Sequence, residues 1–365
     1  MWMKKNKNYV DLKDQPVPEG QHLLEVDDLK MYFHTEDGVV RAVDGVSYTL
    51  DRGETLGVVG ESGSGKSVTA MTIMGLISMP PGKIEGGDVR YRGRSILEMT
   101  EEEMQHIRGN DIAMIFQDPM TSLNPVYKIG KQVGEGLRLH RGYSKQEALK
   151  RATELLDLVG IPEPEKRVNE YPHQFSGGMR QRVMIAMALA CDPDILIADE
   201  PTTALDVTIQ AQIIELMQEM QEKNGNAIIM ITHDLGVVAD MADKIMVMYA
   251  GRPVEFGTAE EIFYESRHPY TWGLIRSIPE QAIEEKKPLT PIHGNPPSLM
   301  NLPEGCVFSP RCPYATDKCR KQRPERVVTE SGHYSACHYS GDPEFLKNAP
   351  ETSRTRKDSK KGGEA

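Results

Sequence analysis

Short apolar runs alternate with longer amphipathic segments along much of the chain. Five apolar runs have the length of buried strands: 56–59, 112–116, 195–198, 227–231 and 244–249. Helix-compatible segments lie among them at 68–76, 179–191, 209–223 and 237–242. Apolar strands that alternate with helices are typical of a parallel sheet covered by helices on both faces. The pattern therefore predicts an α/β fold.

The region before the first buried run has a different pattern. Residues 23–33 and 39–50 predict two strands joined by a turn at 35–38. A glycine-rich turn is predicted at 86–88, followed by a short strand at 89–91.

Helical patterns dominate from 117 to 178. Ser144 and Glu147 have the spacing of a capping box, and the helix that they open ends at Gly160. Because this stretch interrupts the strand–helix alternation, we predict an inserted helical subdomain at about 118–192.

Composition limits the classes of function. The net charge of −11 argues against a protein that coats nucleic acid. The basic N-terminus lacks a following apolar segment, and no run reaches the length of a membrane span. We therefore expect a soluble, cytoplasmic protein without a secretory signal. The charged tail at 346–365 is expected to be disordered.

The sequence from Gly60 to Ser67 reads G-x-x-x-x-G-K-S, the phosphate-binding P-loop. Its glycines let backbone N–H groups close around an anion, and the following helix points its positive end at the phosphates. Lys66 is expected to reach the β/γ-phosphates, and the Ser67 hydroxyl to ligate Mg²⁺. The residues expected to bind ATP here are Gly60, Ser62, Gly63, Gly65, Lys66 and Ser67. The alternative, a chance match in a surface loop, is disfavoured by the flanking strand and helix.

Two carboxylates, Asp199 and Glu200, follow the apolar run at 195–198. The carboxyl ends of parallel strands face the ligand crevice, so Asp199 is expected to hold Mg²⁺ through water and Glu200 to act as general base. His233 follows another predicted strand and can hydrogen-bond a γ-phosphate. An acidic strand cap and a satisfied polar histidine are the structural alternatives.

Ser176, Gly177 and Gly178 stand at the start of a predicted helix and form a second anion site. One ATP does not need two such sites in one chain. A second subunit would explain the duplication.

The order of these motifs resembles the nucleotide-binding subunits of ABC transporters over roughly 23–278. By this resemblance, Gln117 is the Q-loop glutamine, Ser176–Met179 the signature loop, Asp206 the D-loop aspartate and His233 the switch histidine. The signature differs from the commonest form at Phe175 and Met179 but keeps its Ser-Gly-Gly. Phe33 is the aromatic residue expected to stack on adenine, with Tyr32 as its alternative. The implied Mg²⁺ ligands are Ser67, Gln117 and Asp199.

Residues 116–125 and 267–271 resemble the oligopeptide and dipeptide importers within that family, and so does the C-terminal extension at 279–345. The resemblance is to the D-type ATPase subunit. It implies an ATPase at the cytoplasmic face of the cell membrane that powers peptide import. Its implied partners are a second, different ATPase subunit, two permeases and an external binding protein, with no nucleic acid.

Three other functions are alternatives to peptide import. A nickel importer of the same subfamily has the same architecture, and a soluble ABC ATPase of translation or DNA repair shares the cassette. Asp199, Glu200 and His233 together argue against a purely structural P-loop protein. The substrate itself is not encoded in these motifs.

Four of the five cysteines crowd into one C-terminal segment: Cys306, Cys312, Cys319 and Cys337. In a cytosolic chain such a cluster suggests metal before disulfide, although the spacing is not that of a standard zinc finger. Pro313 follows Cys312, and Cys-Pro recurs beside iron–sulfur ligands. Three interpretations stay open: a [4Fe–4S] cluster, which the family resemblance implies, zinc with His333 or His338 nearby, or unligated thiols with an occasional disulfide.

Overall fold

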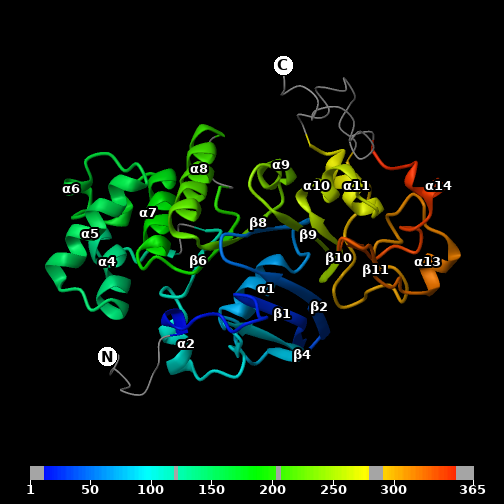
Figure 1. Ribbon diagram of the computed structural model, residues 1–365, viewed down its shortest axis with the longest axis horizontal. Coiled ribbons are helices and arrows are strands. Elements are labelled where there is room, and N and C mark those ends of the chain that lie inside the picture. The colour runs from blue at the N-terminus through cyan, green and yellow to red at the C-terminus, as the bar shows by residue number, and fades with distance from the viewer. Residues whose placement is uncertain (1–11, 119–121, 203–206, 279–290, 351–365) are drawn as a thin grey trace.

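The computed structural model of the protein describes residues 12–118, 122–202, 207–278 and 291–350, which form two β-sheets flanked by helices (Figure 1). The strands are β1 (Leu24–Thr35), β2 (Gly38–Leu50), β3 (Thr55–Val59), β4 (Gly82–Tyr91), β5 (Arg94–Ser95), β6 (Ile112–Ile115), β7 (Ile195–Asp199), β8 (Ala227–Thr232), β9 (Lys244–Tyr249), β10 (Arg252–Thr258), β11 (Val327–Val328) and β12 (Tyr334–Ser335). The helices are α1 (Lys66–Ile73), α2 (Glu101–Ile107), α4 (Ile129–His140), α5 (Lys145–Leu158), α6 (Pro164–Arg167), α7 (Gly177–Leu189), α8 (Val207–Asn224), α9 (Leu235–Ala239), α10 (Ala259–Tyr264), α11 (Pro269–Ile275), α13 (Asp317–Lys321) and α14 (Pro343–Leu346), with short 3₁₀ turns at Leu12–Asp14 and Pro172–Gln174. None of the helices in these ranges is long and apolar enough to cross a membrane.

The larger sheet has eight strands in the order β11-β12-β10-β9-β3-β8-β7-β6. Its strands from β9 to β6 pair in parallel, and every residue of β3, β7 and β8 is buried. The prediction of an α/β fold around a parallel sheet is therefore confirmed. Because β3, β8 and β7 are neighbours, the segments that follow their carboxyl ends meet at one edge of the sheet.

The smaller sheet is antiparallel, with the order β2-β1-β4-β5. The predicted turn at 86–88 is wrong, because β4 runs through it and pairs with β1 on both sides of a bulge. The extra residue of this bulge is on β1, where Asp28 and Leu29 lie opposite Gly87. Gly87 has a φ of 84°, and a Cβ there would lie 2.5 Å from the backbone of Asp27 and Asp28. Glycine permits a bulge inside a strand as readily as a turn between strands.

Helices α4 to α7 gather at one end of the molecule (Figure 1). The predicted capping box of α5 is confirmed, since Glu147 donates its N–H to Ser144 Oγ at 3.3 Å and Ser144 its N–H to the Glu147 carboxylate at 2.8 Å. The helix ends before Gly160, which has a φ of 71°. The glycines of α4 allow close packing, because a Cβ at Gly130 would overlap side chains of Leu149 and Val168.

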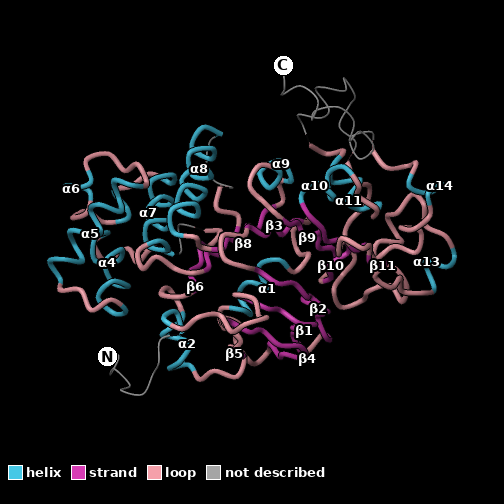
Figure 2. The backbone as a smooth tube through the Cα atoms, in the orientation of Figure 1, coloured by secondary structure: helices cyan, strands magenta, loops and turns pink. Residues whose placement is uncertain are grey.

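The segment 291–350 packs at the opposite end and consists mostly of loops with short elements (Figure 2). Its strand β12 pairs with β10, so this segment extends the larger sheet. Phe308 packs against Tyr249 of β9 at a centroid distance of 5.2 Å. Strand β10 and helix α10 were not predicted, although Thr258 and Glu261 form a capping box like that of α5.

Gly87→Ala should lower the free energy of unfolding by about 1–3 kcal/mol, because alanine at this φ is strained and its Cβ would collide with the β1 backbone. Thermal unfolding followed by circular dichroism measures the effect. Gly86→Ala is the matched control, since a Cβ there meets only the flexible Lys30 side chain at 3.6 Å. Equal melting temperatures for the two variants would contradict this account of the bulge.

Candidate functional site

The P-loop joins β3 to α1, and both sheets constrain its backbone. Gly60 has a φ of 152° and Gly65 a φ of 101°. A Cβ at Gly60 would lie under 3.0 Å from the carbonyl oxygen of Met248 in β9, and one at Gly65 equally close to that of Ala42 in β2. Both positions therefore require glycine for two reasons, the backbone conformation and the lack of space.

The ammonium group of Lys66 lies against the inner side of this loop. It donates hydrogen bonds to the carbonyl oxygens of Gly60 at 2.7 Å and Glu61 at 3.1 Å. Burial lowers the pKa of Lys66, while the charges of Glu200, Asp199 and Glu61 act in the opposite direction. Three carboxylates thus favour the charged form of this buried lysine.

Ser67 and Asp199 meet as the sequence predicted for a Mg²⁺ site. The Ser67 hydroxyl donates to Asp199 Oδ1 at 2.9 Å. Burial raises the pKa of Asp199, against the effect of the Ser67 hydrogen bond. A hydroxyl and a carboxylate are the hard oxygen ligands that Mg²⁺ prefers, so the pair fits this ion. Gln117, the third expected Mg²⁺ ligand, donates its hydrogen bond to Glu200 instead.

Glu200 lies between the other two predicted catalytic residues. Gln117 donates from Nε2 to Glu200 Oε2 at 3.0 Å, and His233 Nδ1 lies 3.3 Å from Glu200 Oε1. The backbone of Glu200 has a φ of 47°, a strained conformation for a residue with a side chain, and its N–H donates to the Ile231 carbonyl at 2.8 Å. The ends of β6, β7 and β8 therefore bring the three side chains together.

The predicted signature residues lie on the helical side of the molecule. Ser176 is the N-cap of α7 and accepts a hydrogen bond from the Met179 N–H at 3.3 Å, while Gly177 is exposed. Helix α7 packs against α4 and α5. Asp206 lies outside the described residues.

The two adenine-stacking candidates differ in their contacts. The Tyr32 hydroxyl donates to Asp44 Oδ1 at 2.9 Å. Phe33 is partly buried and packs against the same apolar cluster as Val68 and Met71 of α1, the helix that begins in the P-loop. The stacking of Phe33 on adenine stays a prediction.

The four C-terminal cysteines have free thiols that line one small cavity of about 20 Å³. Burial raises the pKa of Cys312 to about 11 and that of Cys337 to about 12. In the part of the chain that the structure describes, no group of three or more His, Cys, Asp or Glu residues is arranged to hold a metal ion. The predicted iron–sulfur or zinc site is therefore not confirmed.

The two histidines considered as zinc ligands differ in position. His333 is buried and its Nε2 lies 3.0 Å from a Glu255 carboxylate oxygen, so it is already paired. His338 lines the cysteine cavity, with its Nε2 2.9 Å from the Gln322 carbonyl oxygen.

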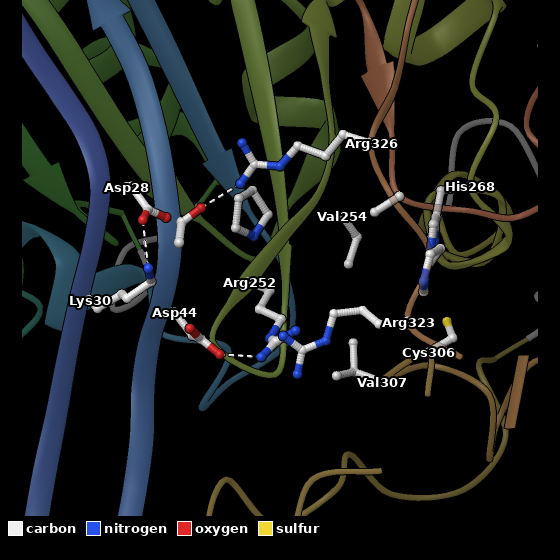
Figure 3. A pocket seen from close by; sticks show the side chains of 14 residues that line it. Asp28, Lys30, Asp44, Arg252, Val254, His268, Cys306, Val307, Arg323 and Arg326 are labelled. Atoms are coloured by element: carbon white, nitrogen blue, oxygen red, sulfur yellow. Dashed lines mark hydrogen bonds and ion pairs between the residues drawn. The ribbon is translucent and has the colours of Figure 1, made fainter. Parts of the chain in front are cut away.

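A second cavity, of about 290 Å³, lies between the antiparallel sheet, β10 and the C-terminal segment (Figure 3). Arg252 pairs there with Asp44, and Lys30 with Asp28. Cys306 lines this cavity as well as the smaller one. The cysteine cavity and this second cavity therefore have a lining residue in common.

One contact to the P-loop was not predicted. Arg311, beside Cys312, forms two hydrogen bonds with the Glu61 carboxylate, at 2.6 and 3.0 Å. The partners are 250 residues apart. The sequence offered no signal for it beyond an arginine next to a cysteine.

Two family models match the chain. The ABC transporter model matches residues 43–203, and the model of the oligopeptide/dipeptide transporter C-terminal region matches residues 254–319. The oligopeptide transport ATP-binding protein OppD of Bacillus subtilis is 58% identical over 312 residues, which cover 86% of this chain and 87% of that protein. The dipeptide transport ATP-binding protein DppD of Escherichia coli is 52% identical, with coverage of 88% and 97%.

A solved structure is similar over the cassette. It is the dimeric structure of a post-hydrolysis state of an ATP-binding cassette bound to ADP and Pi. The similarity covers 65% of this chain and 98% of that chain, with 29% sequence identity and a TM-score of 0.59.

Phe33→Leu should weaken ATP binding about fivefold to a hundredfold, because stacking of a base on an aromatic ring is worth about 1–3 kcal/mol. Leucine keeps most of the apolar contact, so the melting temperature should change little. Titration with a fluorescent ATP analogue measures the affinity. Tyr32→Leu is the matched variant and should bind ATP as the wild type does; a weaker Tyr32→Leu beside an unchanged Phe33→Leu would reverse the assignment.

Proposed function

This chain belongs to the ATP-binding subunits of oligopeptide and dipeptide ABC transporters, and we propose the roles that its residues play in that ATPase. The observation that carries the proposal is the position of Glu200 between Gln117 and His233, beside the Ser67–Asp199 pair. The subunit is an ATPase that powers peptide import. The relatives named above are peptide transport proteins, so the nickel-importer and soluble-cassette alternatives are not favoured.

The P-loop backbone and Lys66 bind the phosphates. Lys66 exchanges its loop carbonyls for phosphate oxygens, and Ser67 and Asp199 hold Mg²⁺, with Gln117 adjoining the site. Bound Mg²⁺ neutralises charge on the phosphate oxygens. Glu200 accepts the proton of the attacking water, which its side chain orients, and His233 hydrogen-bonds the γ-phosphate.

A second ATPase subunit completes the site. Ser176 and Gly177 are exposed at the N-terminus of α7, and the similar solved cassette is dimeric. Ser176, Gly177 and Gly178 therefore bind ATP held by the other subunit, and Asp206, outside the described residues, is proposed as the D-loop aspartate. The subfamily resemblance makes this partner a different chain.

Each part of the chain takes a place in the transporter. The cassette at 23–278 binds nucleotide, and Gln117 and the helical subdomain at about 118–192 couple it to the two permeases. The N-terminal segment at 1–22 precedes the cassette, the C-terminal extension at 279–345 follows it, and the tail at 346–365 comes last. The assembly works at the cytoplasmic face of the cell membrane, and an external binding protein delivers the peptide.

The proposal for catalysis is tested with Glu200→Gln. Turnover should fall about 10²- to 10⁴-fold because the amide cannot accept the proton, whereas ATP binding should persist. Steady-state ATPase assays of the assembled transporter and nucleotide-retention assays measure the two effects. Glu219→Gln, on the exposed side of α8, is the control. Turnover of Glu200→Gln at the wild-type rate would exclude Glu200 as the base.

We further propose that the four C-terminal cysteines hold a [4Fe–4S] cluster. Four free thiols around one cavity supply the donor set that iron requires. One tetrahedral zinc with Zn–S bonds of about 2.3 Å would need its sulfurs about 3.8 Å apart. A cluster of several irons separates its thiolates further than one zinc does, and a metal and sulfide assay tells the two apart.

Protein purified without oxygen should contain iron and acid-labile sulfide in stoichiometric amounts, because four thiolates can then ligate the cluster. Cys319→Ser should lose both, and Cys191→Ser, which alters a buried cysteine outside the cavity, should keep both. Zinc without sulfide would indicate a structural zinc site in place of the cluster. If neither iron nor zinc is found, the four cysteines are ordinary thiols.

A further inference from the structure

The guanidinium of Arg311 uses its donors on groups from three parts of the chain. Besides the Glu61 carboxylate, its Nε donates to the carbonyl oxygen of His293 at 2.9 Å and its Nη2 to that of Ile292 at 3.2 Å. Its Nη1 also donates to the Tyr249 hydroxyl at 3.3 Å. The Arg311 side chain is only 4% exposed. A planar guanidinium held this way presents its two remaining N–H groups to a carboxylate in one fixed orientation.

The backbone of Glu61 is held from the same direction. Its N–H donates to the Tyr270 hydroxyl at 2.8 Å. Tyr270 is fully buried and packs on Tyr249 and Phe308, with ring centroids 4.6 and 5.4 Å away. The second residue of the P-loop is therefore fixed through both its side chain and its backbone by groups outside the loop.

Glu61 is an unexpected residue beside a phosphate site. Its carbonyl oxygen accepts a hydrogen bond from Lys66, and its carboxylate charge acts on the same lysine. A free carboxylate here would repel phosphate oxygens. Arg311, which is itself buried, neutralises this partly exposed carboxylate.

We propose that Arg311 is a positioning residue through which the C-terminal extension sets the affinity of the P-loop for ATP. The proposal rests on the assignment of the P-loop as the ATP site. Arg311 touches neither nucleotide nor Mg²⁺ in this scheme; it acts through Glu61.

The same contact connects the P-loop to the cysteine cavity. The backbone N–H groups of Arg311 and Cys312 both donate to the Phe308 carbonyl oxygen, at 3.0 Å each. Phe308 lines the cysteine cavity and also packs on Tyr270. A shift of Cys312 therefore moves Arg311 and also the ring of Tyr270, whose hydroxyl accepts the Glu61 N–H. Because coupling between two sites is reciprocal, ATP binding in turn stabilises the segment around Cys312.

Arg311→Met tests the positioning role in the full-length chain. Removing the two charge-assisted hydrogen bonds from Arg311 to the Glu61 carboxylate should weaken ATP binding about fivefold to thirtyfold in a fluorescent ATP titration. Arg311→Lys, which keeps the charge but loses the fork, should lie between Arg311→Met and the wild type. The matched control is Arg320→Met, because Arg320 belongs to the same segment but makes only an exposed ion pair with Asp317. It should bind ATP like the wild type.

A second substitution separates positioning from general damage. Glu61→Gln added to Arg311→Met removes the unpaired carboxylate, so the double variant should recover most of the lost affinity. A merely structural role for Arg311 predicts no recovery. Equal weakness of the single and double variants, or wild-type affinity in Arg311→Met, would overturn the proposal.

Lys66→Ala distinguishes failure of this inference from failure of the P-loop assignment. Wild-type ATP binding in Lys66→Ala would refute the assignment, whereas its loss beside normal binding in Arg311→Met would refute only the role of Arg311. The coupling has its own readout: amide hydrogen exchange at 306–319 should slow when ATP binds to the wild type. The slowing should disappear in Arg311→Met, and its absence in the wild type would exclude the coupling.

Discussion

The close contact between the P-loop and the backbones of two sheets constrains everything around the nucleotide site. Gly60 lies against β9 of the larger sheet and Gly65 against β2 of the antiparallel sheet, with no room for a side chain at either position. The two glycines of the loop are therefore placed by main-chain geometry, whereas Glu61 between them is held by the side chains of Arg311 and Tyr270. Since β3 also pairs with β8 and β9, the position of the loop fixes its distance from Asp199 and His233.

The electrostatics of the site follow from this placement. Lys66, Asp199 and Glu200 are brought together where little water reaches, and burial shifts the pKa of Lys66 down and that of Asp199 up. Both shifts oppose the charged forms. In the proposed site, phosphate would lie beside Lys66 and Mg²⁺ beside Asp199, so binding of both would offset the cost of burying these two groups.

The parts of the site that could be predicted are those encoded by local sequence. A P-loop consists of consecutive residues between a strand and a helix, and Asp199 and His233 follow recognisable apolar strands. The bulge at Gly87 was mistaken for a turn because glycine serves both. Helix α10 was missed although its capping box has the same spacing as the one recognised in α5. The fork between Arg311 and Glu61 is different in kind, because no periodicity or spacing relates residues so far apart.

The C-terminal extension is specified by buried charge as much as by apolar packing. Two of its side chains, Arg311 and His333, pair with Glu61 and Glu255 of the cassette, and three of these four side chains are nearly inaccessible. Glu255 also accepts the N–H groups of Arg267 at 2.5 Å and His268 at 3.2 Å, which fixes the start of α11. Buried pairs add little net stability, but loss of one partner leaves an uncompensated charge and is strongly unfavourable. Misplacement of the extension would therefore be costly at two separate points, one in the P-loop and one in β10. This arrangement gives the cassette and the cysteine segment a single relative position, which the coupling through Arg311 requires.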